Sequence, residues 1–234
     1  MSRFSYGFAA LCVGVVMTCG LASAASLMIT PVLLEAAAPQ QGTIVTLQNR
    51  GSKPINGQVR IFAWRQSGGE DVLEPATQVV ASPPIVSIRP GTDHAIRVIR
   101  LSQTPVVGEE SYRVVIDELP DADERRNGVV AVALRYVIPA FFFEPARAQP
   151  RISWFIMREN GTRYLVAQND GDRRARIAEL MLGNKIVAGG LAGYVLGHSQ
   201  RRWKIDSKID PSARRVSAQS DLGAINDTAT VREK

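Results

Sequence analysis

Short segments in which apolar and polar residues alternate recur along this chain, and they constrain its fold more than any other feature. A period of two is typical of β-strands, whose successive side chains point to opposite faces. Turn-forming residues separate the segments, and no stretch resembles an amphipathic helix of convincing length. The seven segments in the first part of the chain are residues 26–35, 42–49, 55–64, 84–90, 94–101, 111–119 and 129–142. This spacing predicts an immunoglobulin-like sandwich.

A charged stretch bounded by prolines, residues 145–150, interrupts the pattern and is predicted to link two domains. Shorter, glycine-punctuated segments follow and predict a smaller β-sandwich: ISWFIMRE, TRYLVAQN, RRARIAELML, NKIVAG, GYVLG and RRWKID. The residues after Pro211 are polar and weakly patterned, which predicts a tail, with a last strand between Leu222 and Val231 left open. We therefore expect an all-β chain of two immunoglobulin-like sandwich domains, residues 25–144 and 151–234, arranged around an interdomain cleft.

The first 24 residues have the composition of a secretory signal peptide. Arg3 supplies the positive charge, an apolar run follows, and Ala22-Ser23-Ala24 forms a small-residue cleavage site. The apolar run is short for a membrane span. Both cysteines, Cys12 and Cys19, lie in the part that would be removed, so we expect a mature chain without disulfides or cysteine metal sites.

The residue types needed for catalysis are scarce. There are only two histidines, and neither has a neighbouring ligand at metal-binding spacing. The adjacent carboxylates Asp117 and Glu118 point to opposite faces of a strand, which disfavours a paired-carboxylate hydrolase. We therefore predict a protein that is not an enzyme and needs no cofactor or metal. A hydrolase remains an alternative that would require carboxylates gathered in one cleft.

The chain is basic, with a formal net charge of +6 and an isoelectric point near 9.7. In an exported protein this favours acidic protein partners or anionic lipid over nucleic acid, and no small-molecule substrate is indicated. Two basic clusters, Arg173-Arg174-Arg176 and Arg201-Arg202-Lys204, fit either the charged outer faces of strands or a surface that docks an anionic partner.

The segment VALRYVIPAFF, residues 132–142, reads as a strand with one apolar face, yet it contains Pro139. Proline has no N–H for a central ladder, so this strand is predicted to lie at a sheet edge. Edges are usually short or charged because their unpaired backbone groups attract other chains. A long apolar edge therefore predicts pairing with a partner chain. A homodimer that covers the edge when no partner is bound is a further hypothesis, which light scattering of the purified chain would test.

Several motifs in this order resemble the PapD-like periplasmic chaperones of chaperone-usher pilus assembly. They are RVIRL, GEESYRVVIDELP and a long alternating strand that ends in FFEP. SLMITPVLLE, LRYVIPAFF and GYVLGHSQRRW make the chain most similar to the archaic, spore-coat-U-type branch. The resemblance implies a periplasmic chaperone that binds pilin-like subunits and delivers them to an outer-membrane usher. The alternative is a secreted adhesive or structural module, which would be expected to carry its own N-terminal donor extension.

The resemblance also implies donor-strand complementation, in which the strand at residues 129–142 completes the sandwich of a subunit that lacks its last strand. Val130, Val132 and Leu134 match the family's donated residues, and Tyr136 and Ile138 continue the same face.

One position pair departs from the family. Many members bind the C-terminal carboxylate of the subunit with an arginine and a lysine, but Pro31 and Pro139 occupy those places here. A buried carboxylate still needs charged donors. Arg113 and then Arg135 are the candidate replacements, although Arg113 could instead pair with Asp117 or Glu118.

Overall fold

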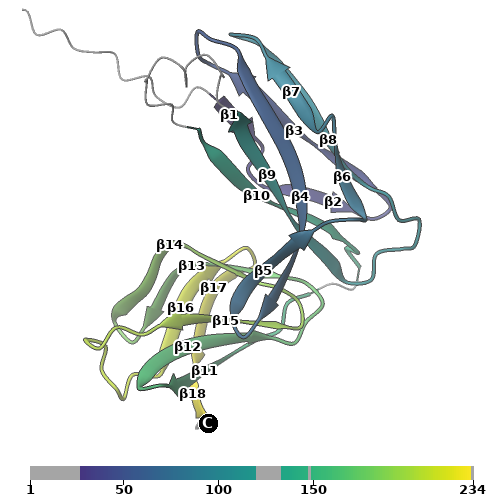
Figure 1. Ribbon diagram of the computed structural model, residues 1–234. Helices are drawn as coiled ribbons and strands as arrows, with labels where there is room; N and C mark the ends of the chain where they lie inside the picture. The colour runs from purple at the N-terminus through teal and green to yellow at the C-terminus, as the bar shows by residue number, and fades with distance from the viewer. Residues whose placement is uncertain (1–26, 120–132, 147–148, 233–234) are drawn as a thin grey trace, which may run out of the picture.

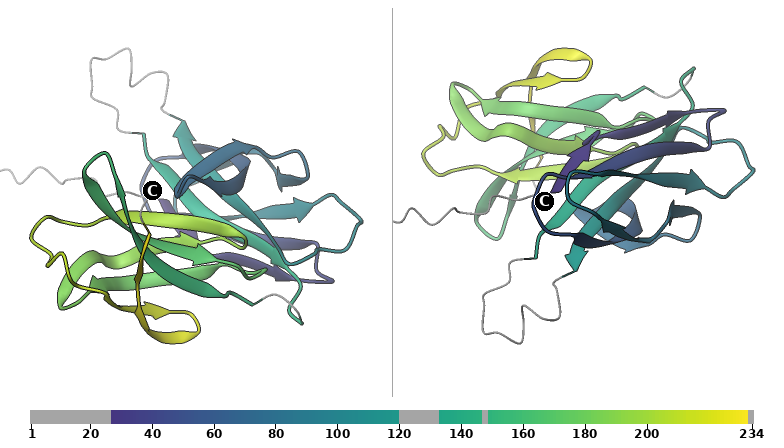
Figure 2. Two further views of the ribbon diagram at one scale, coloured as in Figure 1. Left: turned by 90° about the horizontal axis from the view of Figure 1, so that it is seen from below. Right: turned by 90° about the horizontal axis from the view of Figure 1, so that it is seen from above.

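The computed structural model describes residues 27–119, 133–146 and 149–232, and every regular element in these ranges is a β-strand. The strands form two bodies that meet at one end of the first (Figure 1). Views along the vertical of Figure 1 show the strands of the two bodies running at an angle to one another (Figure 2). This confirms the predicted all-β fold of two sandwich domains. The described residues contain no helix long and apolar enough to cross a membrane.

The first domain consists of two sheets. One sheet has the order β1-β3-β8-β6, with β1 at Leu27–Thr30, β3 at Gly42–Asn49, β8 at Asp93–Arg100 and β6 at Val79–Ser82. The other has the order β2-β10-β9-β4-β5, with β2 at Leu34–Ala37, β10 at Arg135–Phe143, β9 at Glu109–Leu119, β4 at Ile55–Ser67 and β5 at Glu70–Pro75. β7 (Ile85–Ile88) pairs with the start of β4.

Alternate residues of both sheets fill the space between them, as the period of two predicts. Val45 and Leu47 of β3 face Val114 and Ile116 of β9, and all four are fully buried in one cluster. Burial of each such side chain contributes about 1.5–3 kcal/mol relative to exposure. The inward face of β10 joins this cluster through Ile138, Ala140 and Phe142.

The segment expected to form one strand at residues 26–35 is divided between the two sheets. β1 pairs antiparallel with β3, whereas β2 pairs parallel with the end of β10. Pro31 lies at the break, where it cannot continue a ladder because it has no N–H. This division determines how much of β10 is covered.

The second domain also has two sheets. The first has the order β15-β12-β11-β18, with β15 at Ser199–Lys204, β12 at Thr162–Asn169, β11 at Ile152–Glu159 and β18 at Thr230–Arg232. The second has the order β14-β13-β16-β17, with β14 at Lys185–Val195, β13 at Ala175–Leu182, β16 at Arg215–Ser220 and β17 at Gly223–Thr228.

The residues after Pro211 therefore differ from the expected polar tail, because they supply β16, β17 and β18. β16 lies between β13 and β17, and its Val216 and Ala218 are buried in the domain core. Only these two side chains are buried along the strand. The alternation in this strand is too weak to detect from the sequence, and the strand is held in place by its pairing with β13.

Both domains use the same buried asparagine to close a turn. Asn49 ends β3, donates to the carbonyls of Lys53 and Ile88 at 2.7 and 2.9 Å, and accepts from Gly51 N–H at 2.9 Å. Asn169 ends β12 and has the equivalent contacts, donating to the carbonyls of Arg173 and Val195 and accepting from Gly171 N–H. The repeated sequence Gln-Asn-x-Gly at 48–51 and 168–171 marks this turn in each domain.

Candidate functional site

The first part of β10 is an open sheet edge in the described structure. β10 pairs with β9 from Arg135 to Phe143, but β2 covers its other side only from Ala140 to Phe143. Among the described strands, residues 135–139 therefore pair with β9 alone. This is the stretch that contains Pro139.

The hydrogen-bond pattern explains why a proline is tolerated there. Glu118 N–H donates to the Leu134 carbonyl at 2.9 Å, and pairs along an antiparallel ladder alternate between bonded and non-bonded. The register pairs Tyr136 with Ile116 and Pro139 with Arg113. Even-numbered residues of β10 thus bond to β9, whereas the backbone groups of Arg135, Val137 and Pro139 point to the open side. Pro139 therefore removes no bond from the β9 ladder.

The predicted donor residues divide into two sets. Val130 and Val132 lie outside the described residues. Leu134 is half-buried just before β10 begins. Tyr136 packs against the core of the first domain and donates its hydroxyl to the Leu27 carbonyl at 3.2 Å, and Ile138 is buried in that core. Tyr136 and Ile138 thus pack in the core of the first domain itself, and Leu134 lies at the end of that core.

Arg113 lies on the outer face of its sheet, toward the second domain. Its guanidinium carbon is 3.5 Å from the Trp64 ring centroid and 5.9 Å from that of Tyr194 in the second domain. Its nearest carboxylate is Asp71 at 3.9 Å, so the expected alternative pairing with Asp117 or Glu118 is wrong. Burial lowers the pKa of the guanidinium, and the charge of Asp71 opposes this effect. Arg201 also binds Asp71, at 2.8 Å, so two cations share one anion.

Arg135 has a different setting. Its side chain is 64% exposed and pairs with Asp117, which also binds Arg60 at 2.6 Å. Burial would raise the pKa of Asp117, but the hydrogen bonds from Arg135 and Arg60 hold it below its usual range. Arg135 therefore belongs to an ion cluster on the first domain alone.

An apolar cluster joins the domains beside Arg113. Trp64 of β4, Phe141 of β10 and Tyr194 of β14 have ring centroids 5.7–5.8 Å apart, and Leu196 packs with them. Phe142, the next residue, points the opposite way into the core of the first domain. The three consecutive phenylalanines of FFF are a trace of this interface that a search for alternation misses, since a strand buried on both faces loses its alternation.

The β4–β5 hairpin extends from the first domain onto the second (Figure 1). Gln66 donates to the Tyr194 carbonyl at 2.8 Å and accepts from Leu196 N–H at 3.0 Å. At the tip, Gly69 has φ of 84° and its carbonyl accepts from Arg202 N–H. A Cβ at Gly69 would lie 2.7 Å from Arg202 Cγ, so this close approach requires glycine.

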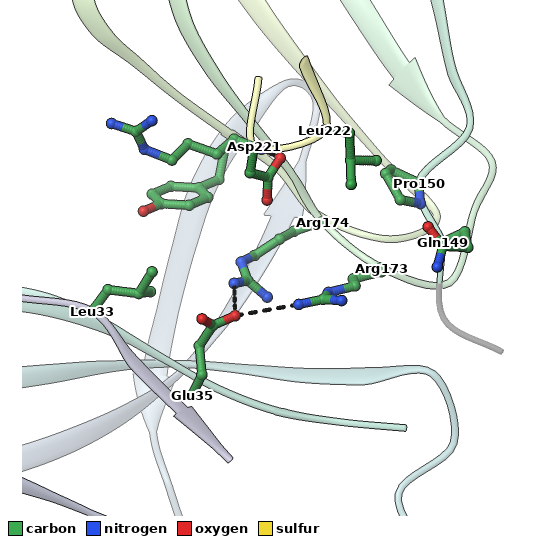
Figure 3. A pocket seen from close by; sticks show the side chains of 10 residues that line it. Leu33, Glu35, Gln149, Pro150, Arg173, Arg174, Asp221 and Leu222 are labelled. Atoms are coloured by element: carbon green, nitrogen blue, oxygen red, sulfur yellow. Dashed lines mark hydrogen bonds and ion pairs between the residues drawn. The ribbon is translucent and has the colours of Figure 1, made fainter. Parts of the chain in front are cut away.

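A charged network joins the domains on the other side of the apolar cluster. Arg174, which is 2% exposed, binds Glu109 of β9 and Glu35 of β2 and lies 3.6 Å from the Phe141 ring centroid. Arg173 reaches the same two carboxylates at 3.3 and 3.6 Å. Of these side chains, Glu35, Arg173 and Arg174 border a cleft of about 220 Å³ between the domains (Figure 3).

Most arginines of the two basic clusters bind carboxylates of the first domain, a role that the sequence interpretation did not consider. Arg173 and Arg174 bind carboxylates of the first domain, and Arg201 and Arg202 bind Asp71 and Glu70. They are neither free outer faces nor an exposed docking surface. Their partners in the first domain lie more than a hundred residues away except for Glu109, and Arg202 also binds Glu159 of its own domain, 43 residues away, so sequence spacing did not reveal them.

Among the described residues, no group of three or more histidine, cysteine, aspartate or glutamate side chains is placed to hold a metal ion. The distinctive geometry is instead an open strand edge on the first of two immunoglobulin-like domains, beside a charged interdomain cleft. It defines a class of proteins that bind other chains by adding a strand to a sheet.

Residues 26–149 match the family of pili and flagellar-assembly chaperones, at the PapD N-terminal domain. The match covers more than half of the chain, and the chain belongs to this family of PapD-like pilus-assembly chaperones. The family is one of chaperones and not of enzymes.

Solved structures agree. A chain of the CsuC–CsuE chaperone–tip adhesion subunit pre-assembly complex, from the archaic chaperone-usher Csu pili of Acinetobacter baumannii, is 26% identical with a TM-score of 0.72, over 90% of this chain and 100% of that one. A chain of the Salmonella enterica complex of SafA pilin with the SafB chaperone is 17% identical with a TM-score of 0.65, over 87% of this chain and 96% of that one. The E. coli chaperone DraB is 17% identical with a TM-score of 0.61, over 86% of this chain and 97% of that one. The last two show the fold alone. No curated protein matches the chain.

Proposed function

We propose that this protein is a periplasmic chaperone that completes the fold of pilus subunits with β10 and the residues before it, and then passes them to an outer-membrane usher. The open side of residues 135–139 carries the proposal, because an incomplete subunit needs both backbone partners and apolar side chains. The signal-peptide composition and the family support a periplasmic location. Strand donation needs no chemical step, so no catalytic role is assigned.

The inward face of the strand provides the apolar part of the interaction. Val130, Val132 and Leu134 have the parity of Tyr136 and Ile138, which point into the first domain. In the complex, the cores of chaperone and subunit would then be continuous. At about 1.5–3 kcal/mol for each buried side chain, these three contribute roughly 5–9 kcal/mol before the cost of ordering.

Hydrogen exchange tests strand addition directly. The protein is co-expressed in a Gram-negative periplasm with small exported proteins encoded near it, and the co-purified complex is compared with the free monomer. The amides of Arg135 and Val137, which point to the open side, are expected to exchange quickly in the free chain and slowly in the complex. Tyr136 and Ile138, bonded to β9, serve as internal controls and stay protected in both. Unchanged fast exchange at Arg135 and Val137 in a complex would exclude pairing at this edge.

We further propose that Arg113 binds the C-terminal carboxylate of the subunit. It lies directly opposite Pro139, where relatives have the lysine, and it faces the second domain. With Arg201 it shares a single aspartate, which leaves this cluster one positive charge in excess. Arg135 is more exposed, and its ion cluster with Asp117 and Arg60 lies on the first domain alone, which makes it the weaker candidate.

A peptide with the sequence of a subunit's last strand tests this role in two forms, with a free carboxylate and with a terminal amide. Amidation is expected to weaken binding to wild type by about tenfold or more, because it removes one partner of a charge-assisted pair. In Arg113→Ala the two peptides should bind alike, whereas Arg135→Ala should discriminate as wild type does. Equal discrimination by Arg113→Ala would assign the carboxylate to another residue.

A further inference from the structure

The second domain has a basic groove that strand donation does not use. It has a volume of about 660 Å³ and lies between the β11–β12 turn, the loop before β16 and strand β18. β18 and the C-terminus lie at the end of this domain that is remote from the first (Figure 1). Arg158, Arg163, Arg214 and Arg232 line the groove, and its lining among the described residues includes no carboxylate.

The positive charge of these arginines is not cancelled by their contacts. Arg163 donates to the Ile209 carbonyl at 2.6 Å, and Arg214 donates to the carbonyls of Pro211 and Ala213 at 2.8 and 2.9 Å. Carbonyl groups fix the direction of a guanidinium but carry no net charge. Both side chains are thus held in place while remaining available to an anion.

The other two arginines are available in different ways. Arg232 lies over the Phe155 ring, with its guanidinium carbon 3.8 Å from the centroid. Arg158 is exposed and has no hydrogen bond or ion pair within the described part of the chain. Asp210, whose charge interacts with Arg163 and Arg214, accepts hydrogen bonds from the Ser212 backbone and hydroxyl, and these contacts together lower its pKa. The four arginines that line the groove outnumber Asp210, so the described residues here carry a positive excess.

The shape of the groove indicates the kind of ligand. Met157 and Val231 contribute an apolar part between the arginines, whereas Ile156 beside them is buried in the core of the domain. A bilayer surface is best met by outward-projecting apolar side chains on a flat or convex face. A hollow with both apolar and cationic walls instead fits an extended chain whose side chains alternate between apolar and acidic. Unlike the interdomain arginines, these have no carboxylate of the first domain to bind.

We propose that this groove binds an extended, acidic segment of a partner protein, with carboxylates on the arginines and apolar side chains on Met157 and Val231. It would be a second docking surface, independent of the strand edge on the first domain. The chaperone could therefore hold a subunit at one end and an acidic partner segment at the other.

A fluorescein-labelled peptide of alternating glutamate and valine is the probe, and fluorescence anisotropy with the full chain is the measurement. The expected result is saturable binding that weakens with added salt, since the attraction is between exposed charges. The same peptide with glutamine in place of glutamate should not bind. Arg158→Glu combined with Arg232→Glu is expected to weaken binding of the acidic peptide by at least about tenfold.

Arg89→Glu combined with Arg50→Glu makes the same charge change on exposed residues of the first domain and serves as the matched control. This control should bind the peptide as wild type does, apart from a small loss from net charge. Equal loss in both double variants would mean non-specific attraction and would overturn the proposal. Binding to phosphatidylglycerol vesicles with no binding to the peptide would overturn it in favour of a lipid surface. Circular dichroism and subunit co-purification show whether each variant is folded.

Discussion

Leu134→Asp is expected to abolish the recovery of pilus subunits with this chaperone. Leu134 is half-buried, and its carbonyl accepts from Glu118 N–H in the register of β10, so it lies where the first domain's own core ends. In the proposed complex its side chain enters the groove of the subunit. The substitution loses about 1.5–3 kcal/mol of apolar burial and adds the cost of an unpaired carboxylate. Together these weaken binding by about a thousandfold or more.

Val137→Asp is the matched control for this prediction. Val137 is 47% exposed and belongs to the same open stretch, but its side chain lies on the outer face of the sheet. The backbone groups that would pair with a subunit are unchanged by either substitution. Co-purification is expected to be lost with Leu134→Asp and largely kept with Val137→Asp. Equal recovery with both variants would contradict an inward-facing donor strand, whereas loss with both would indicate that the outer face also contacts the subunit.

The strand pattern was sufficient to predict the fold because the core of each sandwich follows local alternation. Val45 and Leu47 on β3, or Ile96 and Val98 on β8, are fully buried at the inward positions that a period of two defines. Pro139 similarly predicted an edge, and the described β10 is covered by β2 only beyond that proline. Both inferences rest on backbone chemistry that acts within a few residues.

The interface between the domains was not predictable in this way. Phe141 and Phe143 lie on the face of β10 opposite to the one that alternation marked as apolar, and they pack against Arg174 and Arg173 of the second domain. Arg113 was the first candidate for the carboxylate anchor, but its partners Trp64, Tyr194 and Asp71 come from three separate strands and were not predicted. Contacts of this kind depend on how two finished sheets meet, and no sequence period encodes that.

Arg174→Met is expected to destabilise the contact between the domains by about 3–5 kcal/mol, the usual cost of breaking a buried ion pair. Arg174 is 2% exposed, and its partner Glu109 has a side chain that is also 2% exposed, so the substitution leaves a buried carboxylate with its main partner removed. The loss is limited to the free energy of the interface, because the domains can separate and hydrate Glu109. Trp64 lies in that interface, and its fluorescence reports separation during urea unfolding.

The effect should depend on pH in a direction that identifies Glu109 as its cause. Burial raises the pKa of the Glu109 carboxyl, and the charges of Arg174 and Arg173 oppose this effect, so removing Arg174 raises the pKa further. A carboxyl with a raised pKa in the folded state favours folding as the pH falls through that value toward its ordinary value of 4.5. The difference between variant and wild type should therefore be largest at neutral and higher pH, where Glu109 must be ionised, and smaller in mild acid.

Arg173→Met is the control that separates this cause from a general loss of charge. Arg173 binds the same two carboxylates, but at 3.3 and 3.6 Å and with 24% of its side chain exposed. Its removal is expected to cost about 1 kcal/mol or less, because Arg174 still neutralises Glu109 and solvent screens the exposed partner. Equal destabilisation by the two variants, or a loss in Arg174→Met that does not change with pH, would show that packing against Phe141, rather than the charge of Glu109, makes Arg174 important. If the prediction holds, the stability of the contact between the two domains depends on one arginine and on the protonation of one carboxylate.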